Sequence, residues 1–146
     1  MLLLIYRYLS NLFFIPILFF FFLRFLVSKE TVSSILQKFS ISRKKRPEGD
    51  LIWINGVSVG ESKTGIAVAR EIKKIKPKSS ILISTSTLSA YNLLSKSKNN
   101  FVVIFFPLDI NFLIKRFLKY WNPSSVIFIE SEIWPNIFYI LKEKSI

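Results

Sequence analysis

The most informative part of the sequence reads Ile127-Phe128-Ile129-Glu130-Ser131-Glu132-Ile133-Trp134-Pro135-Asn136. The apolar residues from Val126 to Ile129 are rich in β-branched side chains and predict a strand buried on both faces. Pro135 suits the first position of a helix, because its φ is fixed and it has no N–H. Glu130 and Glu132 fall between this strand and this helix, where open parallel sheets bind ligands. They are therefore candidate site residues, although acids that only cap such a turn are equally common.

The preceding sequence alternates between short apolar runs and amphipathic segments. The predicted strands are Leu51–Ile54, Ser80–Ile83, Phe101–Phe105 and Val126–Ile129. The predicted helices are Glu61–Lys76, a helix that ends near Lys96, Ile110–Tyr120 and Trp134–Lys142. Such alternation forms βαβ units, so the sequence predicts an α/β fold with a parallel sheet covered on both faces.

Polar groups follow every predicted strand and should meet at one edge of the sheet. They are Ser58 to Glu61, the cluster Ser84-Thr85-Ser86-Thr87, Asp109, and Glu130 with Glu132. The Ser/Thr cluster suits an anion cradle at a helix N-terminus, and simple N-capping explains it equally well. We expect a binding cleft along this edge.

The motif Val57-Ser58-Val59-Gly60-Glu61 follows the first predicted strand. Gly56 and Gly60 allow a tight turn, Ser58 suits a helix cap, and the helix dipole favours Glu61 in the first turn. A plain helix-terminal acid is the alternative for Glu61. The motif has neither the G-x-G-x-x-G spacing nor a P-loop lysine, so a nucleotide-phosphate loop is discounted.

The amino-acid composition limits which partners and which types of reaction are possible. The chain has 21 lysines and arginines against 9 acidic residues, a net charge of +12, which indicates an anionic partner such as nucleic acid, anionic lipid or a phosphorylated substrate. It has no cysteine and no histidine, which excludes thiolate chemistry, a Ser-His triad and nearly all transition-metal sites. Proton transfer is left to Asp, Glu, Lys or Tyr.

The N-terminal residues 1–27 are strongly apolar, and Arg7 and Arg24 flank an uncharged run. They predict a membrane anchor helix that either spans the bilayer or lies in its interface, with Pro16 as a candidate kink. A cleaved signal peptide is one alternative, but no small-residue cleavage site follows the apolar run. A buried core helix is the other, and the four phenylalanines Phe19–Phe22 argue against it.

Residues 28–49 predict a basic linker with a short amphipathic helix. Most basic residues near the apolar segment follow it, including the run Arg43-Lys44-Lys45-Arg46, so the positive-inside rule assigns the remaining chain to the cytoplasm. This run also suits anionic lipid headgroups. Nucleic-acid binding is the usual alternative for such a run, and the membrane segment argues against it.

Four motifs carry a resemblance to a known family. They are Val57-Ser58-Val59-Gly60-Glu61, Ser84-Thr85-Ser86-Thr87, Phe106-Pro107-Leu108-Asp109 with Lys115-Arg116-Phe117-Leu118, and Asn122-Pro123 leading to Glu130-Ser131-Glu132-Ile133-Trp134-Pro135-Asn136. In order and spacing the chain resembles the N-terminal half of bacterial 3-deoxy-D-manno-octulosonic acid (Kdo) transferases, which attach Kdo to the lipid A precursor.

The resemblance implies a GT-B glycosyltransferase made of two Rossmann-like domains. The expected organisation is an anchor at 1–27, a linker at 28–49 and a Rossmann-like acceptor-binding domain at 50–146, with the C-terminal donor domain absent. Such an enzyme transfers Kdo from CMP-Kdo to lipid IVA at the cytoplasmic face of the inner membrane, with CMP-Kdo held by the missing domain or a partner chain. It needs no metal or further cofactor and binds no nucleic acid.

By the same resemblance, Glu61 is the general base, and Glu130 and Glu132 support it. The other motif residues are expected to bind substrate: Ser58, Gly60, Ser84, Thr85, Thr87, Asp109, Trp134 and Asn136. The alternative is a catalytically inactive, truncated, membrane-bound acceptor-binding module.

Overall fold

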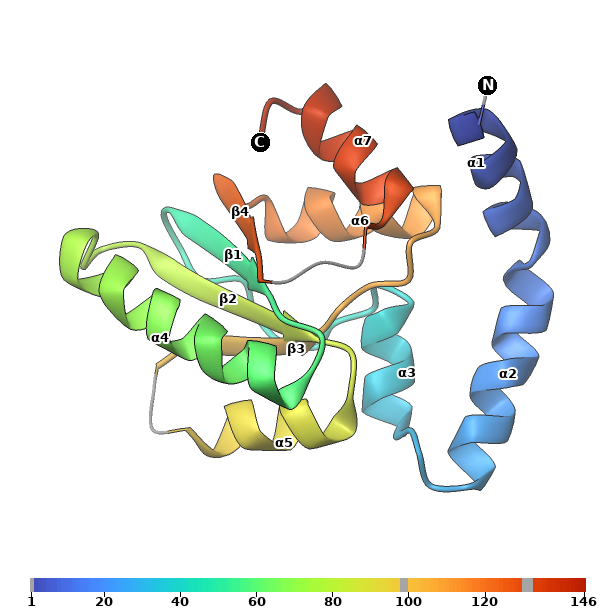
Figure 1. Cartoon of the computed structure of the whole chain (residues 1–146), viewed down its shortest axis with the longest axis horizontal. Helices are drawn as coiled ribbons and strands as arrows, with labels where there is room; N and C mark the ends of the chain where they lie inside the picture. Colours follow the sequence, from blue (N-terminus) through green and yellow to red (C-terminus); the bar gives the residue numbers. More distant parts are fainter. Residues whose placement is uncertain (1, 98–99, 130–132) are drawn as a thin grey trace.

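The computed structural model describes residues 2–97, 100–129 and 133–146, with side chains from Ile5 onward. Strands and helices alternate as expected (Figure 1). In chain order the elements are α1 (Leu2–Leu12), α2 (Phe14–Leu26), α3 (Val32–Lys38), β1 (Leu51–Asn55), α4 (Val59–Ile75), β2 (Ser80–Thr85), α5 (Leu88–Lys96), β3 (Val102–Phe105), α6 (Asn111–Trp121), β4 (Ser125–Phe128) and α7 (Pro135–Glu143).

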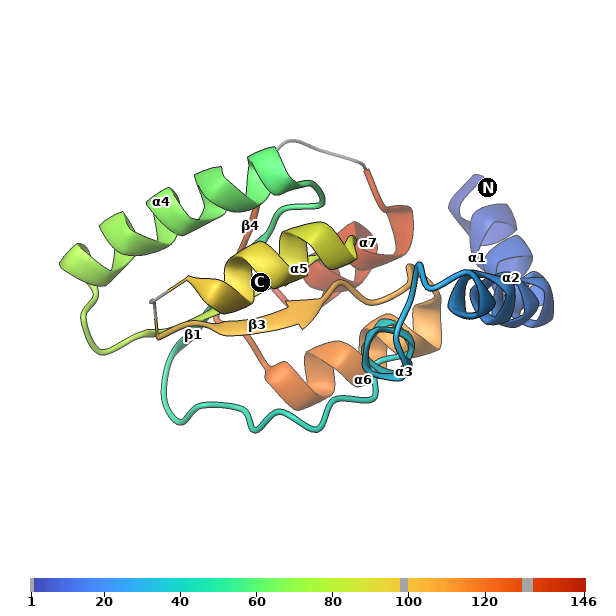
Figure 2. The ribbon, with the colours of Figure 1, turned by 90° about the horizontal axis from the view of Figure 1, so that it is seen from below.

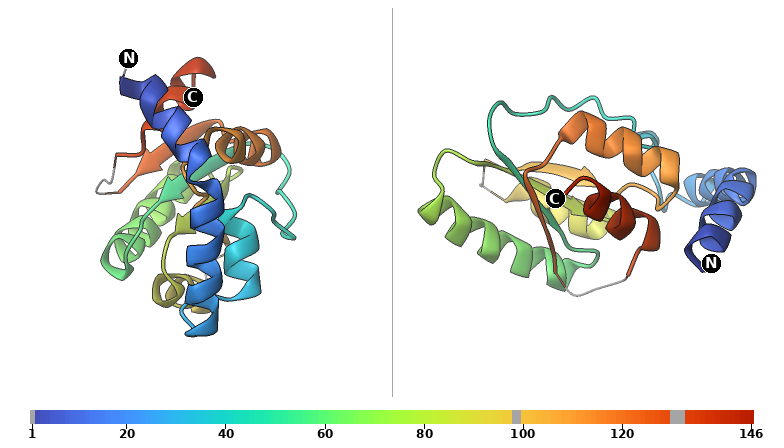
Figure 3. Two further views of the ribbon diagram at one scale, coloured as in Figure 1. Left: turned by 90° about the vertical axis from the view of Figure 1, so that its right-hand side faces the viewer. Right: turned by 90° about the horizontal axis from the view of Figure 1, so that it is seen from above.

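The strands form one four-stranded parallel sheet in the order β3-β2-β1-β4. Trp53 of the central strand β1 is level with Leu82 of β2 and Val126 of β4. Because side chains alternate along a strand, Trp53 packs toward α6 and α7, whereas Ile52 and Ile54 pack toward α4 and α5. Figure 2 shows α4 and α5 on one side of the sheet and α6 on the other, and Figure 3 gives two further views of this arrangement. The predicted α/β fold with a covered parallel sheet is confirmed.

Two strands differ from the sequence-based expectation. β2 continues to Thr85, so Ser84 and Thr85 lie inside a buried strand rather than in the loop after it. β4 is half-buried along its length, so the expectation of a strand buried on both faces is wrong. The reason is its place in the sheet, because among the described residues β4 pairs with β1 alone and forms an edge.

Residues 28–49 cover the opposite edge strand, β3. The side-chain oxygen of Gln37 on α3 accepts a hydrogen bond from the backbone N–H of Phe105 at 3.1 Å. Lys44 Nζ donates a hydrogen bond to the carbonyl oxygen of Val103. These are backbone groups that a further strand would otherwise pair with, so this segment closes the β3 edge.

The N-terminal segment forms two helices rather than one. The stretch Ile5–Leu12 is bent by 51° from Phe14–Leu26. Pro16 accounts for the break, because it has no N–H to donate to the carbonyl oxygen of Leu12 and its ring crowds that carbonyl. Within residues 2–97, 100–129 and 133–146, no single helix has the length and apolarity needed to cross a membrane, while the bent pair meets that criterion jointly. The single anchor helix expected at 1–27 is therefore not confirmed.

One face of the bent pair packs on the rest of the protein. Phe21 of α2 is buried with Phe39, Ile110 and Leu113, and Phe14 and Ile17 pack against the same cluster. The ring centroids of Phe14 and Phe39 lie 5.8 Å apart in an edge-on arrangement. Figure 3 shows α1 and α2 lying along one side of the molecule. The segment expected to be a separate anchor is thus part of the packed structure.

Candidate functional site

The turn between β1 and α4 holds Glu61, the predicted general base. Ser58 is the N-cap of α4, and its Oγ accepts a hydrogen bond from the Glu61 N–H at 3.3 Å. The Glu61 carboxylate folds back over the turn, where it accepts hydrogen bonds from the N–H of Val57 at 2.6 Å and from Ser58 Oγ at 3.1 Å. A reciprocal arrangement of this kind fixes the first turn of a helix.

Glycine is required at Gly56 by a close approach. A Cβ there would lie 3.0 Å from the carbonyl carbon of Glu61 and 3.2 Å from its Cβ, so the backbone of the turn would have to move. Gly60, a predicted substrate-binding residue, is exposed, and a Cβ there would meet only Ser58 Oγ, at 3.9 Å. Close packing therefore explains why residue 56 is glycine. The space beside Gly60 is open.

Glu61 combines a fixed orientation with access to solvent. Its side chain is half-buried, and each carboxylate oxygen accepts one hydrogen bond from the turn. An ionised carboxylate offers about four lone-pair positions, so both oxygens retain capacity for a further donor. A hydroxyl group that approaches this turn would meet a carboxylate held in one orientation, as general-base catalysis needs.

The cluster Ser84-Thr85-Ser86-Thr87 is split between two roles. Ser84 is fully buried, and its Oγ accepts a hydrogen bond from Trp53 Nε1 at 2.8 Å and donates one to Asn55 Oδ1 at 2.7 Å. Thr85 is also fully buried and donates to the carbonyl oxygen of Val57 at 3.0 Å. These hydroxyls stabilise the sheet beneath Glu61, so Ser84 and Thr85 lie in a strand and not at the helix N-terminus where an anion cradle was expected. Their role in substrate binding stays a prediction.

Of the two threonines in the cluster, Thr85 is buried and Thr87 is exposed. It is the N-cap of α5, and its Oγ1 accepts a hydrogen bond from the N–H of Ala90 at 3.2 Å. Simple capping, the alternative weighed for the cluster, describes this residue. Its role in substrate binding stays a prediction.

Asp109 organises a second group of residues, at the exit of β3. Its carboxylate accepts hydrogen bonds from the N–H groups of Asn136 at 3.0 Å and Ile137 at 2.9 Å, and thus caps the N-terminus of α7. The side-chain amide of Asn136 in turn donates to the backbone carbonyl oxygen of Asp109 at 2.6 Å. Both residues are buried and hold the exit of β3 against the start of α7. Their contact with substrate stays a prediction.

Tyr6 of α1 completes this second group. Its hydroxyl donates to the Asp109 carboxylate at 2.9 Å. Burial raises the pKa of Tyr6, and the adjacent Asp109 charge and hydrogen bond raise it further. Burial likewise raises the pKa of Asp109, and the three hydrogen bonds that it accepts oppose that shift. Tyr6 could not be predicted as a partner of Asp109, because the two residues are 103 positions apart.

Trp134 is the N-cap of α7 and is half-buried beside Phe106, with ring centroids 6.1 Å apart. Its indole N–H is buried and has no hydrogen-bond partner among the described residues. Glu130 and Glu132, the predicted supporting acids, lie outside the described residues. Asn136 Oδ1, a buried acceptor, also lacks a partner within the described ranges.

The predicted site residues thus form two groups along one edge of the sheet. Glu61, Ser58, Gly60, Ser84, Thr85 and Thr87 gather at the exits of β1 and β2, and Asp109, Trp134 and Asn136 gather where β3 ends and α7 begins. In the part of the chain that the structure describes, no three His, Cys, Asp or Glu side chains are grouped closely enough to hold a metal ion. The arrangement supplies one oriented, accessible carboxylate, which suits proton abstraction.

A family model described as 3-deoxy-D-manno-octulosonic-acid transferase (kdotransferase) matches residues 33–146. The chain belongs to this family. The match takes in every predicted site residue and corresponds to the N-terminal domain of the Kdo transferases. The resemblance seen in the four motifs is thereby confirmed.

Kdo transferases from distant organisms are similar to this chain. The probable mitochondrial 3-deoxy-D-manno-octulosonic acid transferase of Arabidopsis thaliana is 38% identical over 105 residues, 69% of this chain and 23% of that protein. The Rickettsia bellii enzyme is 34% identical over 115 residues, 78% of this chain and 28% of its own length. The Haemophilus influenzae enzyme is 31% identical over 96 residues, 65% of this chain and 22% of its own. No solved structure matches the chain.

The chain therefore spans about a quarter of the length of these Kdo transferases.

Proposed function

We propose that this chain is the acceptor-binding part of a membrane-attached Kdo transferase, with Glu61 as the general base. The observation that carries the proposal is the Glu61 carboxylate, which is oriented by Val57 and Ser58 and yet accessible. Membership of the Kdo transferase family supports Kdo as the sugar that is transferred. The acceptor is lipid IVA, the lipid A precursor, and the donor is CMP-Kdo.

In the proposed step, Glu61 takes the proton of an acceptor hydroxyl while the hydroxyl oxygen bonds to the anomeric carbon of Kdo. The bond between that carbon and the phosphate oxygen of CMP breaks, and CMP leaves as a phosphate monoester. Removing the proton during attack is where a positioned carboxylate contributes to the rate. The step needs no metal, and the donor is held by the remaining part of the transferase or by a partner chain.

Two further features support a lipid acceptor at a membrane. The N-terminal helices expose many large apolar side chains, and the basic residues Lys29, Arg43 and Lys45 that follow them are exposed. Basic residues beside an apolar segment favour the anionic cytoplasmic leaflet of the inner membrane, which attracts them electrostatically. The net charge of +12 suits the phosphate groups of a lipid A precursor.

The first experiment separates binding from transfer. Labelled lipid IVA is added to membranes that contain this chain and no other Kdo transferase, with CMP-Kdo generated in situ. We expect saturable binding of lipid IVA, and transfer of Kdo when a donor-binding domain of the family is also supplied. Binding without transfer under these conditions would favour an inactive acceptor-binding module. Absence of both would contradict the proposal.

Glu61→Gln tests the base. Glutamine keeps an oxygen that accepts the Val57 N–H bond, so binding of lipid IVA should persist while the transfer rate falls by about 10²–10⁴-fold, the usual contribution of a general base. Glu71→Gln is the matched control, because Glu71 is an exposed acid on the same helix and pairs with the exposed Lys74. Transfer by Glu61→Gln at the rate of the control would rule Glu61 out as the base.

A further inference from the structure

Both ends of the bent helix pair α1–α2 are fastened to the same side of the protein. Near its start, the Tyr6 hydroxyl donates to Asp109 at 2.9 Å, and the Arg7 guanidinium lies 4.2 Å from the centre of the Tyr139 ring. Near its end, Arg24 Nε lies 3.2 Å from the Glu30 carboxylate. The helix pair therefore contacts the rest of the protein both near its start and near its end.

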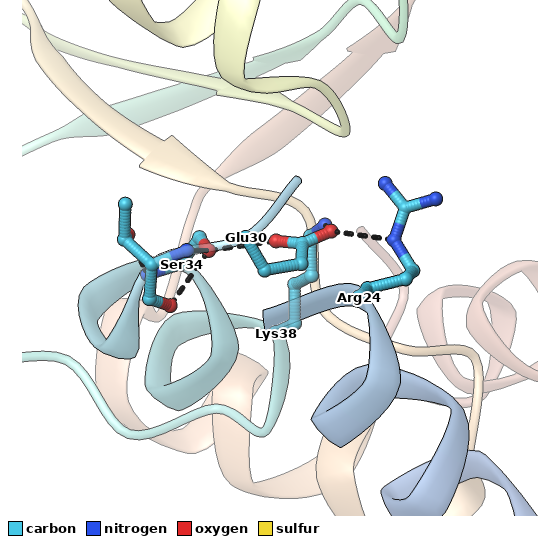
Figure 4. A network of polar contacts seen from close by, with 5 residues as sticks. Arg24, Glu30, Ser34 and Lys38 are labelled. Carbon is cyan, nitrogen blue, oxygen red and sulfur yellow. Dashed lines mark hydrogen bonds and ion pairs between the residues drawn. The ribbon is translucent and has the colours of Figure 1, made fainter. Parts of the chain in front are cut away.

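The attachment at the end of α2 is a buried polar network, shown in Figure 4. Glu30 is almost fully buried and accepts hydrogen bonds from Lys38 Nζ at 2.6 Å and from Ser34 Oγ at 2.6 Å, in addition to Arg24. The ammonium group of Lys38 also lies 5.1 Å from the centre of the Phe21 ring on α2. Charges this deeply buried need all their partners, so the network fixes α2 against α3.

These contacts at both ends are incompatible with a helix pair that crosses the membrane. A helix that crosses a bilayer has its two ends on opposite sides of about 30 Å of hydrocarbon. Here Tyr6 and Arg24 bind residues of one protein body, so both ends of α1–α2 lie on one side. A crossing would pull Tyr6 away from Asp109 and would leave the carboxylate with two of its three donors.

The outward face of the pair is almost entirely apolar. Its exposed large side chains are Ile5, Tyr8, Leu9, Leu12, Phe13, Ile15, Leu18, Phe19, Phe20, Phe22, Leu23, Phe25 and Leu26. Large apolar side chains exposed in this number mark a contact with lipid or with another protein. The helices thus have one face that binds the protein and one that faces outward.

Charge indicates which of these partners covers the face. An apolar hollow of about 240 Å³ between α2 and α3 is lined by residues that include Val32 and Leu36, and the next groove shares these two residues and adds Arg43 and Lys44. A third hollow, which shares Ile41 with that groove, is lined by Arg116 and Lys119. The surface changes from apolar to basic along this path, as the edge of an anionic bilayer does from tails to headgroups.

We propose that α1–α2 lies in the plane of the membrane interface and does not cross the membrane. Its apolar face enters the anionic leaflet, and the basic groove and the hollow at Arg116 and Lys119 bind lipid phosphates. The inference rests on the membrane attachment proposed above and is independent of Kdo transfer. The N-terminus and the catalytic face then lie on the same side of the membrane.

The first test uses the absence of cysteine from the chain, which lets introduced cysteines be labelled without background. A protease-cleavable tag is fused to the N-terminus, and Lys29→Cys supplies a second reporter at an exposed position. In inverted inner-membrane vesicles that float with the protein, we expect the tag to be cleaved and Lys29→Cys to react with an impermeant maleimide. A protected tag beside a reactive cysteine would show a span and overturn the proposal, as would failure to float.

The second test asks whether the pair stays docked in the membrane. The rings of Phe14 and Phe112 lie 5.5 Å apart, so Phe14→Cys/Phe112→Cys should be joined within one chain by a short bifunctional maleimide. Phe14→Cys/Lys74→Cys is the control, because Lys74 is near the far end of α4, on the other side of the molecule (Figure 1). A cross-link that forms in detergent and is lost in membranes, or that joins two chains, would overturn the proposal.

The third test addresses the headgroups. Arg116→Gln/Lys119→Gln should bind vesicles that contain phosphatidylglycerol roughly 30-fold more weakly, the loss expected for two basic groups at an anionic surface. Lys63→Gln/Lys74→Gln on the exposed face of α4 is the control and should bind as the parent does. Equal binding by both variants would contradict a role for this hollow. None of these measurements depends on transfer activity, so their failure is distinct from failure of the proposed function.

Discussion

At the scale of single residues, Asp109 shows how a side chain can serve the fold at a position where a ligand was expected. Its carboxylate is buried and accepts hydrogen bonds from Tyr6, Asn136 and Ile137. It thereby joins three elements that are distant in sequence, namely α1, the exit of β3 and the start of α7. The same contacts hold Asn136 and the start of α7 at the exit of β3.

The raised pKa of Asp109 predicts a pH dependence of stability. Because burial raises its pKa in the folded state above the ordinary 3.8, the folded protein binds this proton more tightly than the unfolded chain does. The contribution of Asp109 to the free energy of unfolding is therefore largest below pH 3.8 and declines as the pH rises through the raised value.

Thermal unfolding of the detergent-solubilised protein between pH 4 and pH 7 measures this effect. Asp109→Asn cannot ionise, so the difference in stability between the parent and Asp109→Asn should change across this interval in favour of the variant as the pH rises. The variant should be less stable at every pH, because an amide cannot accept all three hydrogen bonds with the same geometry. A constant difference across the interval would contradict a raised pKa.

Residue types and their order were enough to predict Glu61 in the first turn of a helix and a cap at Ser58. They were not enough for Ser84 and Thr85, which were expected to be available to an anion. Hydroxyl groups look alike in a sequence whether they face a ligand or a buried partner. Trp53 Nε1 and Asn55 Oδ1 need such a partner in the core, and only the register of β1 and β2 reveals that Ser84 supplies it.

At the scale of elements, the contact between α2 and α3 depends on Glu30. This carboxylate is buried, pairs with Lys38 and Arg24 and accepts a hydrogen bond from Ser34. Removal of one partner from a buried ion pair leaves an uncompensated charge, which is more costly than the loss of an exposed pair. The network is therefore a buried polar link between α2 and α3.

Glu30→Gln should lower the free energy of unfolding by about 3–5 kcal/mol, the usual cost of breaking a buried ion pair. Glu71→Gln, which removes an exposed pair with Lys74, should cost less than about 1 kcal/mol. Denaturant titration in detergent, followed by tryptophan fluorescence, gives both values. Similar changes in the free energy of unfolding for the two variants would mean that the Glu30 network does not stabilise the fold more than an exposed ion pair does.

The alternation of strands and helices was predictable because each element carries its own period of apolar residues. The break between α1 and α2 was predictable in kind, since Pro16 was a candidate kink. The docking of these helices was not, because their residues are apolar on all sides and the sequence does not tell which side binds protein. That information lies in contacts such as Phe21 with Ile110 and Leu113, which are remote in sequence.

At the scale of the whole molecule, the two edges of the sheet differ. Gln37 and Lys44 cover β3, whereas β4 is half-buried and pairs with β1 alone among the described residues. An apolar hollow of about 200 Å³ beside β4 is lined by residues that include Ile75 and Ile127. Exposed strand edges next to apolar surface are sites of association between chains.

We therefore expect the isolated chain to self-associate through this side even in detergent. Ile75→Lys should reduce association, because Ile75 is 80% exposed, and should change the free energy of unfolding by no more than about 0.5 kcal/mol. Sedimentation velocity across a range of protein concentrations measures the effect, with Lys63→Gln as a control on the exposed face of α4. An unchanged distribution of species for Ile75→Lys would place the association elsewhere.

The contact between Tyr6 and Asp109 also bears on the order of events during synthesis. The two residues are 103 positions apart, and another contact of α1, between Arg7 and Tyr139, involves a residue that is made later still. At about 5–20 residues per second, the ribosome needs several seconds after α1 emerges before either partner exists. Throughout this interval α1 lacks both partners, although α2 can already pack on Lys38 and Phe39 of the segment that follows it. The apolar N-terminal helices are therefore available to the membrane before the rest of the fold has formed.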